Sequence, residues 1–424
     1  MRNRFLSLLI LGFLFVFGAC PRQKSAEQAA QSGLVSRAKA IHERVLALDA
    51  HIDIEVSFFT PERPDRIGYQ KLASLPAMKS GGLDGAFFTA YVEQGPLTDE
   101  GFATAHDLAV EKINRIHHVA EVEMPKEVAL ALTPQDVSQI HEQGKTVAII
   151  GLENGYPIGE NIKNVEKFYN LGVRYITLSH IGHNQVCDSN LGLDGQPPVH
   201  NGLSPFGREV VAEMNRLGMI IDVSHISKKS MLDVIRLSKA PVMASHSTHR
   251  DFCGIERMWD DEQLLALKKN GGVFHLVGLS MSIKAEPPEK TAAISALREE
   301  MGFPKDYWPF FLAFEKASPE TTREYNRRLE AIEKQYPSAS VRDFVDHIDT
   351  LVERIGIDHV GISSDFYDQS WSLKGWKDAG ETFNITLELV RRGYSEDDIA
   401  KIWSGNILRV WREVMDAARR LQAD

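Results

Sequence analysis

The sequence is poor in cysteine, has no excess of basic residues and has no apolar run long enough to cross a bilayer. Three cysteines among 424 residues cannot form a disulfide scaffold or a multi-thiolate zinc site. The 48 Lys and Arg residues are outnumbered by 58 Asp and Glu residues, so the chain lacks the basic face that a nucleic-acid partner needs. No predicted helix opens with the phosphate-binding pattern GxGxxG or GxxxxGK(S/T), which argues against a nucleotide-binding protein.

The N-terminus has the pattern of a secretory signal. Arg2 and Arg4 precede an apolar stretch at residues 5–17, and a bilayer span needs about 20 such residues. We therefore expect residues 1–19 to be a signal peptide and the protein to be exported. Because a signal peptide is not a transmembrane helix, any contact with a membrane must come from another feature.

A cysteine follows the apolar stretch directly. The segment Gly-Ala-Cys20 is similar to a bacterial lipoprotein processing site, which implies a lipid anchor on Cys20 at the cell envelope, facing the periplasm or the exterior. The alternative is an ordinary signal peptide with an incidental cysteine. Residues 21–33 are small and polar without apolar periodicity, so we expect them to form a tether. The sequence leaves open whether Cys187 and Cys253 pair.

Beyond residue 34 the composition is that of one globular domain, with apolar runs alternating with segments of helical spacing. Short runs rich in Val, Ile, Phe and Thr are typical of buried parallel strands. There are eight of them, at 46–54, 83–92, 146–154, 174–180, 219–225, 241–247, 271–278 and 359–366. Eight strand–helix units favour a (β/α)8 TIM-like barrel over an open doubly wound sheet. We therefore predict a single barrel domain over residues 34–424.

A long insertion near residues 284–340 separates the last two predicted strands. It carries an aromatic segment, KDYWPFFLAFEK, and after it a highly charged one, TTREYNRRLEAIEKQYP. The aromatic part suits either a helical lid over a site or a contact in a homodimer, and the charged part suits a solvated helix face. Both interpretations of the aromatic part stay open.

Polar residues stand at the C-terminal ends of six of the predicted strands. They are His51, Asp53, Glu153, His180, His225, His246 and Asp365. A single histidine at a strand end is more often a core residue bonded to a carbonyl group, but six strands with the same feature indicate one shared pocket. In a (β/α)8 barrel the active site lies at this end.

The residue types in this group are those of a metal centre. His51 and Asp53 have period-two spacing and therefore share one strand face. Imidazole and carboxylate ligands without thiolates suit a catalytic zinc or similar divalent ion. His225 and His246 form a second pair, and Glu153 stands on a strand between the two pairs, where its two oxygens could bridge two ions. Two ions about 3.5–4 Å apart activate water and polarise the bond under attack.

Several of these segments resemble the membrane dipeptidase (renal dipeptidase) family of zinc peptidases, over most of residues 45–415. The similar segments are DAHIDIE, GLENG, RYITLSHIGHN, GLSPFGREVVAEMNRLGMIIDVSHIS, PVMASHS, DHIDTLVERIGIDHVGISSDF and GYSEDDIAKIWSGNILRV. The resemblance implies a binuclear zinc barrel that hydrolyses dipeptides and tolerates a D-residue at the carboxyl end. It also implies that His51 and Asp53 hold one zinc, that His225 and His246 hold the other, and that Glu153 bridges them.

The resemblance implies roles for three further residues. His180 would contact the substrate and stabilise the oxyanion, Asp365 would carry a proton from the attacking water to the leaving amine, and Arg257 would anchor the substrate carboxylate. Two loops depart from the family pattern: Arg-Asn-Val-Pro-Asp reads Arg-Met-Trp-Asp-Asp at 257–261, and Asp-Phe-Asp-Gly reads Asp-Phe-Tyr-Asp at 365–368. We therefore expect the chemistry to be shared and the choice of substrate to differ.

Two other functions are compatible with parts of the sequence. A related amidohydrolase acting on an N-acyl, lactone or β-lactam substrate often carries a His-x-His pair and a carbamylated lysine, whereas this chain has His-x-Asp and a glutamate. A surface binding lipoprotein could keep the barrel without catalysis. Retention of all five ligand residues together with Asp365 argues against that second alternative.

Overall fold

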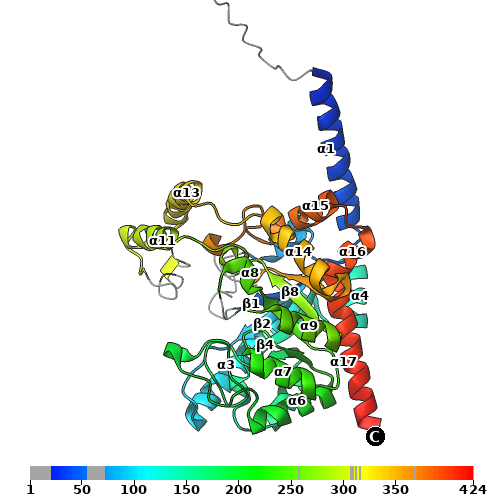
Figure 1. Ribbon diagram of the computed structural model, residues 1–424, viewed down its shortest axis with the longest axis vertical. Helices are drawn as coiled ribbons and strands as arrows, with labels where there is room; N and C mark the ends of the chain where they lie inside the picture. Colours follow the sequence, from blue (N-terminus) through cyan, green and yellow to red (C-terminus); the bar gives the residue numbers. More distant parts are fainter. Residues whose placement is uncertain are drawn as a thin grey trace, which may run out of the picture.

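The computed structural model describes residues 21–54, 72–255, 258–305, 310, 313–314, 317–366 and 369–423 (Figure 1). The predicted signal peptide, the predicted lipidation site Cys20, the predicted substrate anchor Arg257 and most of the aromatic part of the insertion lie outside these ranges. Within them, no helix combines the length and the apolar character needed to cross a membrane.

The predicted (β/α)8 barrel is confirmed. Eight parallel strands run in the spatial order β1-β2-β4-β5-β6-β7-β8-β9. They are β1 (Leu48–Asp53), β2 (Gly85–Tyr91), β4 (Thr146–Glu153), β5 (Val173–Thr177), β6 (Ile220–Asp222), β7 (Met243–Ser247), β8 (Val273–Val277) and β9 (Val360–Ser363), one in each predicted run. A ninth strand, β3 (Val128–Leu130), pairs only with β4 and was not predicted.

The two ends of the sheet meet through the segment that follows β9. The backbone N–H of Asp365 donates to the carbonyl oxygen of His51 at 3.3 Å, and the N–H of Ser364 donates to the carboxylate of Asp49 at 3.0 Å. Asp49 is buried, and burial raises its pKa to about 6 against the opposing effect of the hydrogen bonds from Ser364 and His51. These bonds bring the strand that carries His51 next to the loop that carries Asp365.

Alternation along β4 shows how the sequence directs a side chain into the barrel. Val147 and Ile149 pack in one hydrophobic cluster with Trp411, whereas the intervening residues pack in the other cluster, against the surrounding helices. Because side chains alternate along a strand, Glu153 lies on the same face as Val147 and Ile149. That face points into the barrel, and Glu153 therefore ends inside its C-terminal mouth.

The helices surround the sheet and follow the expected start and stop signals. The main ones around the barrel are α3 (Asp99–His118), α4 (Pro134–Glu142), α5 (Lys163–Asn170), α6 (Pro205–Leu217), α7 (Lys228–Leu237), α9 (Asp261–Asn270), α14 (Val341–Ile355), α15 (Phe383–Arg392) and α17 (Asn406–Ala423). In α6 the Ser204 side chain caps the N–H of Gly207, Pro205 opens the helix, and Gly218 ends it at φ +78°.

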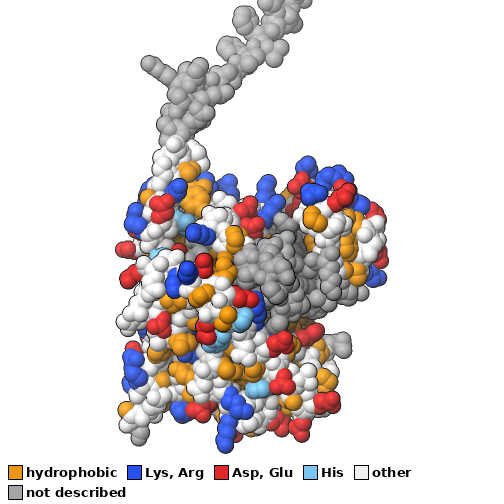
Figure 2. Space-filling view, turned by 180° about the vertical axis from the view of Figure 1, so that it is seen from behind, with side chains coloured by type: hydrophobic (Ala, Val, Ile, Leu, Met, Phe, Trp, Pro, Cys, Tyr) orange, Lys and Arg blue, Asp and Glu red, His pale blue; other side chains and the backbone are white. Residues whose placement is uncertain are grey.

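The insertion forms a separate lobe on one side of the barrel (Figure 1). Its helices α11 (Pro288–Glu300) and α13 (Pro319–Gln335) enclose a small core of their own, made of Ile294, Leu297, Phe310, Tyr325 and Leu329. The outer face of α13 exposes charged side chains of both signs, as predicted for a solvated face, and Figure 2 shows acidic and basic groups over this lobe. Buried Lys290 on α11 joins the two helices through an ion pair with Glu333 at 2.9 Å, and it also pairs with Glu286, just before α11, at 2.7 Å.

The polar segment predicted as a tether is helical. Residues 21–33 form the first part of α1 (Pro21–His42), which rises from the barrel in Figure 1. The segment is rich in Ala and Gln, residues that favour a helix even without an apolar face. The end of α1 is fixed to the barrel, because His42 bonds Thr386 at 2.8 Å and the carbonyl oxygen of Gly81 at 2.9 Å.

The two remaining cysteines do not pair. Cys187 and Cys253 are both buried and free, and burial raises the pKa of the Cys187 thiol to about 12. Both side chains therefore act as small apolar residues in the core.

Candidate metal centre

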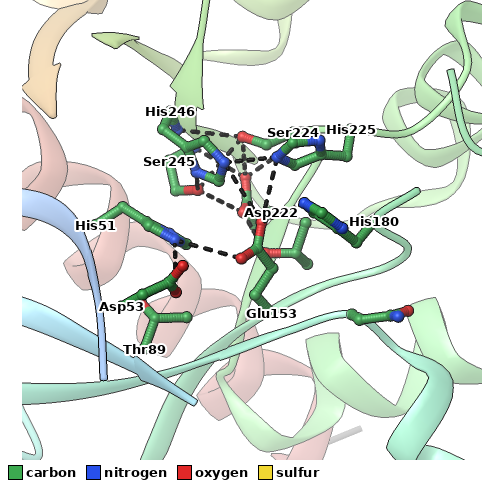
Figure 3. Close-up of polar contacts among 12 residues, drawn as sticks. His51, Asp53, Thr89, Glu153, His180, Asp222, Ser224, His225, Ser245 and His246 are labelled. Atoms are coloured by element: carbon green, nitrogen blue, oxygen red, sulfur yellow. Dashed lines mark hydrogen bonds and ion pairs between the residues drawn. The ribbon is translucent and has the colours of Figure 1, made fainter. Parts of the chain in front are cut away.

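The structure brings together all seven polar residues predicted at the strand ends. Figure 3 labels all of them except Asp365. Three strands supply side chains directly: His51 and Asp53 lie on β1, Glu153 ends β4 and His246 lies on β7. The loops that follow β5, β6 and β9 supply the others, which are His180, His225 and Asp365. The C-terminal mouth of the barrel is therefore the site, as predicted.

Glu153 is the centre of the group. Its Oε1 lies 3.2 Å from Nε2 of His225, 3.4 Å from Nε2 of His246 and 3.9 Å from Nε2 of His180. Its Oε2 lies 3.4 Å from Nε2 of His51. The carboxylate therefore has one oxygen facing each side of the site, which is the geometry that bridging of two cations requires.

Three sets of residues have ligand atoms within 4.8 Å of one another. They are His51 with Glu153 and His246, Glu153 with His180 and His225, and His51 with Asp53 and Asp365. These sets place His180 and Asp365 within reach of a cation, although the sequence predicted them to act on the substrate. Their role as substrate-facing residues stays a prediction.

Burial and mutual charge shift the protonation of these groups. Burial and the charge of the neighbouring Glu153 raise the pKa of Asp53 to about 6, against the opposing effect of His51. Although burial alone would raise it, the pKa of Glu153 lies well below its usual range because the four surrounding histidines favour its anion. Burial lowers the pKa of His180 to about 3, so this ring is neutral near pH 7.

A hydrogen-bonded chain orients His246. Ser245 Oγ lies 2.9 Å from Nδ1 of His246 and 2.6 Å from Oδ2 of Asp222, a fully buried carboxylate. If the serine hydroxyl donates to the carboxylate, Nδ1–H of His246 donates to the serine oxygen. Nε2 of His246 then carries the lone pair that faces Glu153, which is the tautomer a metal ligand needs.

A second chain orients His51. The hydroxyl of Tyr175 lies 2.7 Å from Nδ1 of His51 and 2.7 Å from Oγ1 of Thr89. All three side chains are buried. The chain fixes the ring of His51 with Nε2 toward Asp53 and Glu153. Sequence reasoning missed both chains, and the one available signal was the acidic Asp222 within an otherwise apolar strand.

Strained backbone is concentrated at the site. Of the four non-glycine residues with positive φ in the described ranges, three are Asn154 at +82°, His225 at +61° and Asp365 at +51°. Asn154 directly follows Glu153, and its side chain bonds Asn184 and the backbone of Val92 and Tyr156 at 3.0–3.1 Å. Strain of this kind persists only where surrounding contacts enforce it, and it commonly marks functional positions.

The donor set fits a divalent cation. Within the described part of the chain, Glu153 Oε1 is buried and makes no hydrogen bond, although three imidazole nitrogens point at it. Four imidazole nitrogens and three carboxylates, without sulfur, suit zinc or a similar ion with open coordination positions. The side chains open onto a cavity of about 360 Å³, a volume adequate for a small-molecule substrate.

A parallel (β/α)8 barrel with this donor set at its C-terminal mouth defines a metal-dependent hydrolase. Residues 35–424 match the membrane dipeptidase family (peptidase family M19). The chain therefore belongs to that family, and it is a metal-dependent dipeptidase.

Individual relatives agree with this assignment. The crystal structure of the probable dipeptidase PvdM from Pseudomonas aeruginosa is 31% identical, with a TM-score of 0.75, covering 91% of this chain and 100% of that one. Dipeptidase aclJ of Aspergillus oryzae is 30% identical over 82% of this chain and 71% of its own length. Dipeptidase tcpJ of Claviceps purpurea is 28% identical over 91% of this chain and 79% of its own length.

Proposed function

We propose that this protein is a binuclear zinc dipeptidase with Glu153 as the bridging ligand. The observation that supports it is the position of Glu153, with Oε2 near His51 and Oε1 near His225 and His246. His51 and Asp53 would complete one site, and His225 and His246 the other. Two zinc ions supply a water of lowered pKa and a polarised carbonyl group at such a centre.

His180 is proposed to stabilise the negative charge on the substrate carbonyl oxygen. Its ring packs edge-on against Tyr91 with centroids 4.7 Å apart, which fixes its orientation at the cavity wall. Because burial keeps the ring neutral, one nitrogen carries a proton that can be donated as charge develops on the oxygen. A donor placed in advance of the reaction contributes most when charge appears only in the transition state.

Asp365 is proposed to move the proton. Its side chain lines the cavity next to His225 and His246, and its backbone is held by the bond to His51. A carboxylate there can accept a proton from the attacking water and return it to the leaving amine. The peptide nitrogen then departs as an amine.

Arg257 is proposed to bind the substrate carboxylate and so to restrict the substrate to dipeptides. Its neighbours Met258 and Trp259 line a second part of the cavity, which also borders Asp365. A guanidinium gives a forked, charge-assisted grip on a carboxylate. Tolerance for a D-residue at the carboxyl end is part of this proposal.

Export and a lipid anchor on Cys20 are proposed from the N-terminal sequence. The helix α1 would then act as a spacer of 22 residues between the anchor and the barrel. Two alternative roles are proposed for the insertion, a lid over the site and a contact in a homodimer. Detergent partitioning of wild type against Cys20→Ala tests the anchor, and sedimentation of the soluble region tests the dimer.

A panel of substrates separates the candidate functions. The purified protein is assayed on dipeptides, N-acyl amino acids, lactones and β-lactams, before and after chelation and with zinc restored. The proposal predicts hydrolysis of dipeptides that chelation abolishes and zinc restores. Preference for another substrate class would indicate the related amidohydrolase activity, and no hydrolysis by the zinc-loaded protein would indicate a binding lipoprotein.

A further inference from the structure

The cavity over the metal centre has two parts of unequal size. The larger part has a volume of about 360 Å³, and the smaller part, about 130 Å³, has roughly a third of that. Beyond the metal centre, the larger part is lined by Tyr91, Leu193 and Trp371, and the smaller part by Met258, Trp259 and Val277. Ile181, Leu279 and Asp365 border both parts. A substrate cleaved at the metal centre therefore extends one residue into each part.

The proposed chemistry sets the direction of the substrate, and this inference rests on that proposal. His180, which would stabilise the carbonyl oxygen, lines only the larger part, on the opposite side of Glu153 from His51 (Figure 3). The acyl residue, which is the N-terminal one, therefore lies in the larger part. The exposed carboxylate of Glu93 lines the same part and complements the ammonium group of a free N-terminus.

The larger part offers apolar surface to a side chain. Ile181 and Leu193 leave 40% and 37% of their surface exposed, which is unusual for large aliphatic residues beside a site. The loop that carries them is already folded, because the N–H of Gly182 donates to the carbonyl oxygen of Leu191 at 2.8 Å. Gly182 has φ +107°, and a Cβ there would lie 2.8 Å from Gln94 and 3.0 Å from Leu193. Binding of an apolar side chain would bury this surface without reorganising the loop.

The smaller part is closed by packed residues. Trp259 is buried, and its ring meets Phe274 edge-on with centroids 5.0 Å apart. Its backbone pairs with Thr248 and Arg250, at 3.3 and 2.9 Å. In the wild-type protein a large side chain could enter only by displacing this tryptophan or Met258 beside it, which dense packing resists.

We propose that the enzyme selects dipeptides with a large apolar N-terminal residue and a small C-terminal residue. Leu193 and Ile181 are the specificity-determining residues of the larger part, and Met258 and Trp259 limit the smaller part. The selectivity follows from the two volumes and from the exposed surface of Leu193, which lines the larger part and not the smaller one.

Isomeric dipeptides test the proposal, because they have the same composition and differ only in order. We compare kcat/KM for Phe-Ala and Ala-Phe, with the C-terminal residue in the L form and in the D form. The enzyme should prefer Phe-Ala by about tenfold or more in whichever series it hydrolyses, a typical discrimination for a side chain that fits one pocket and not another. Equal rates, or a preference for Ala-Phe, would overturn the proposal.

Two substitutions assign the preference to the two parts. Leu193→Ala should reduce the ratio of Phe-Ala to Ala-Ala hydrolysis, and Met258→Ala should raise the ratio of Ala-Phe to Ala-Ala hydrolysis. Leu265→Ala, at a leucine exposed to 55% on α9, is the matched control and should change neither ratio. Unchanged ratios in both cavity variants would overturn the assignment of the N-terminal side chain to the larger part and of the C-terminal side chain to the smaller part.

The outcome also separates this inference from the proposed function. Zinc-dependent hydrolysis of dipeptides without the predicted order preference contradicts the selectivity alone. Failure of the zinc-loaded protein to hydrolyse any dipeptide contradicts the proposed function itself.

Discussion

Nε2 of His225 and Nε2 of His246 lie 2.6 Å apart, and both lie within 3.4 Å of the same oxygen of Glu153. Two imidazole lone pairs at this distance repel each other unless a proton or a cation lies between or beside them. Because Ser245 bonds Nδ1 of His246, the lone pair of that ring is directed at this point. The relationship between the two rings therefore indicates where one cation binds.

Asp365→Asn should leave the metals bound and lower kcat by a factor on the order of 10²–10⁴, because an amide keeps the shape but cannot carry the proton. Metal content and steady-state kinetics are measured on the same preparation. Loss of metal with unchanged turnover per remaining ion would instead make Asp365 a ligand, in agreement with its place beside His51 and Asp53.

Ser245→Ala and Tyr175→Phe should each weaken metal binding by about 10–100-fold, since each removes the hydroxyl group that orients a ligand histidine. The measurement is a competitive zinc titration against a chromophoric chelator. Ser80→Ala, at an exposed serine that bonds only the backbone of its own helix, is the control. Unchanged zinc affinity in both variants would show that these chains stabilise the fold and not the metal site.

Amidation of the substrate C-terminus should weaken hydrolysis by wild type more than tenfold, because a buried charge-assisted pair is worth about 2–5 kcal/mol. In Arg257→Ala the same amidation should have little further effect, since the partner of the carboxylate is already missing. Comparing the effect of amidation in wild type and in Arg257→Ala isolates the interaction between the arginine and the substrate carboxylate. Equal amidation penalties in the two enzymes would remove Arg257 from the site.

Asp188→Asn should destabilise the loop that carries Leu193. The carboxylate of Asp188 accepts hydrogen bonds from the backbone N–H groups of Val199, His200 and Gly202 at 2.7–3.0 Å. Replacing it should lower the free energy of unfolding by about 1–3 kcal/mol at neutral pH. Burial alone would raise the pKa of Asp188, but these bonds hold it below its usual value. The stabilisation is therefore full above the ordinary aspartate pKa of about 3.9 and disappears as the pH falls through the lower folded-state pKa.

Urea unfolding of the chelated protein measures this difference as a function of pH. The difference in free energy of unfolding between wild type and Asp188→Asn should become smaller as the pH falls. The control variant Asp107→Asn, at an exposed aspartate, should show no comparable difference from wild type. A difference that stays constant down to the lowest pH at which both proteins fold would mean that charge on Asp188 is not the cause.

The sequence predicted which residues meet at the mouth of the barrel, because their positions along the chain indicate which strand face and which strand end they occupy. His51, Glu153 and His246 stand at the ends of apolar runs, and a barrel brings such ends together regardless of the details of packing. The same reasoning found eight strands and missed β3, whose three residues are too few to form a pattern.

The groups that orient the ligands could not be predicted in this way. Tyr175 reaches His51 across the barrel, and its strand position alone is that of any buried aromatic residue. Ser245 matters only because Asp222 lies on the neighbouring strand at 2.6 Å. Such roles depend on side-chain contacts between strands, which only a three-dimensional structure provides.

The metal content of the active enzyme tests the central claim, that Glu153 bridges two ions. Elemental analysis of freshly prepared, fully active protein should find close to two divalent ions per chain. Glu153→Gln should lower the occupancy of both sites together, because a neutral amide is a poor bridge between cations. At most one ion in fully active wild type, or loss of a single ion in Glu153→Gln, would contradict the account.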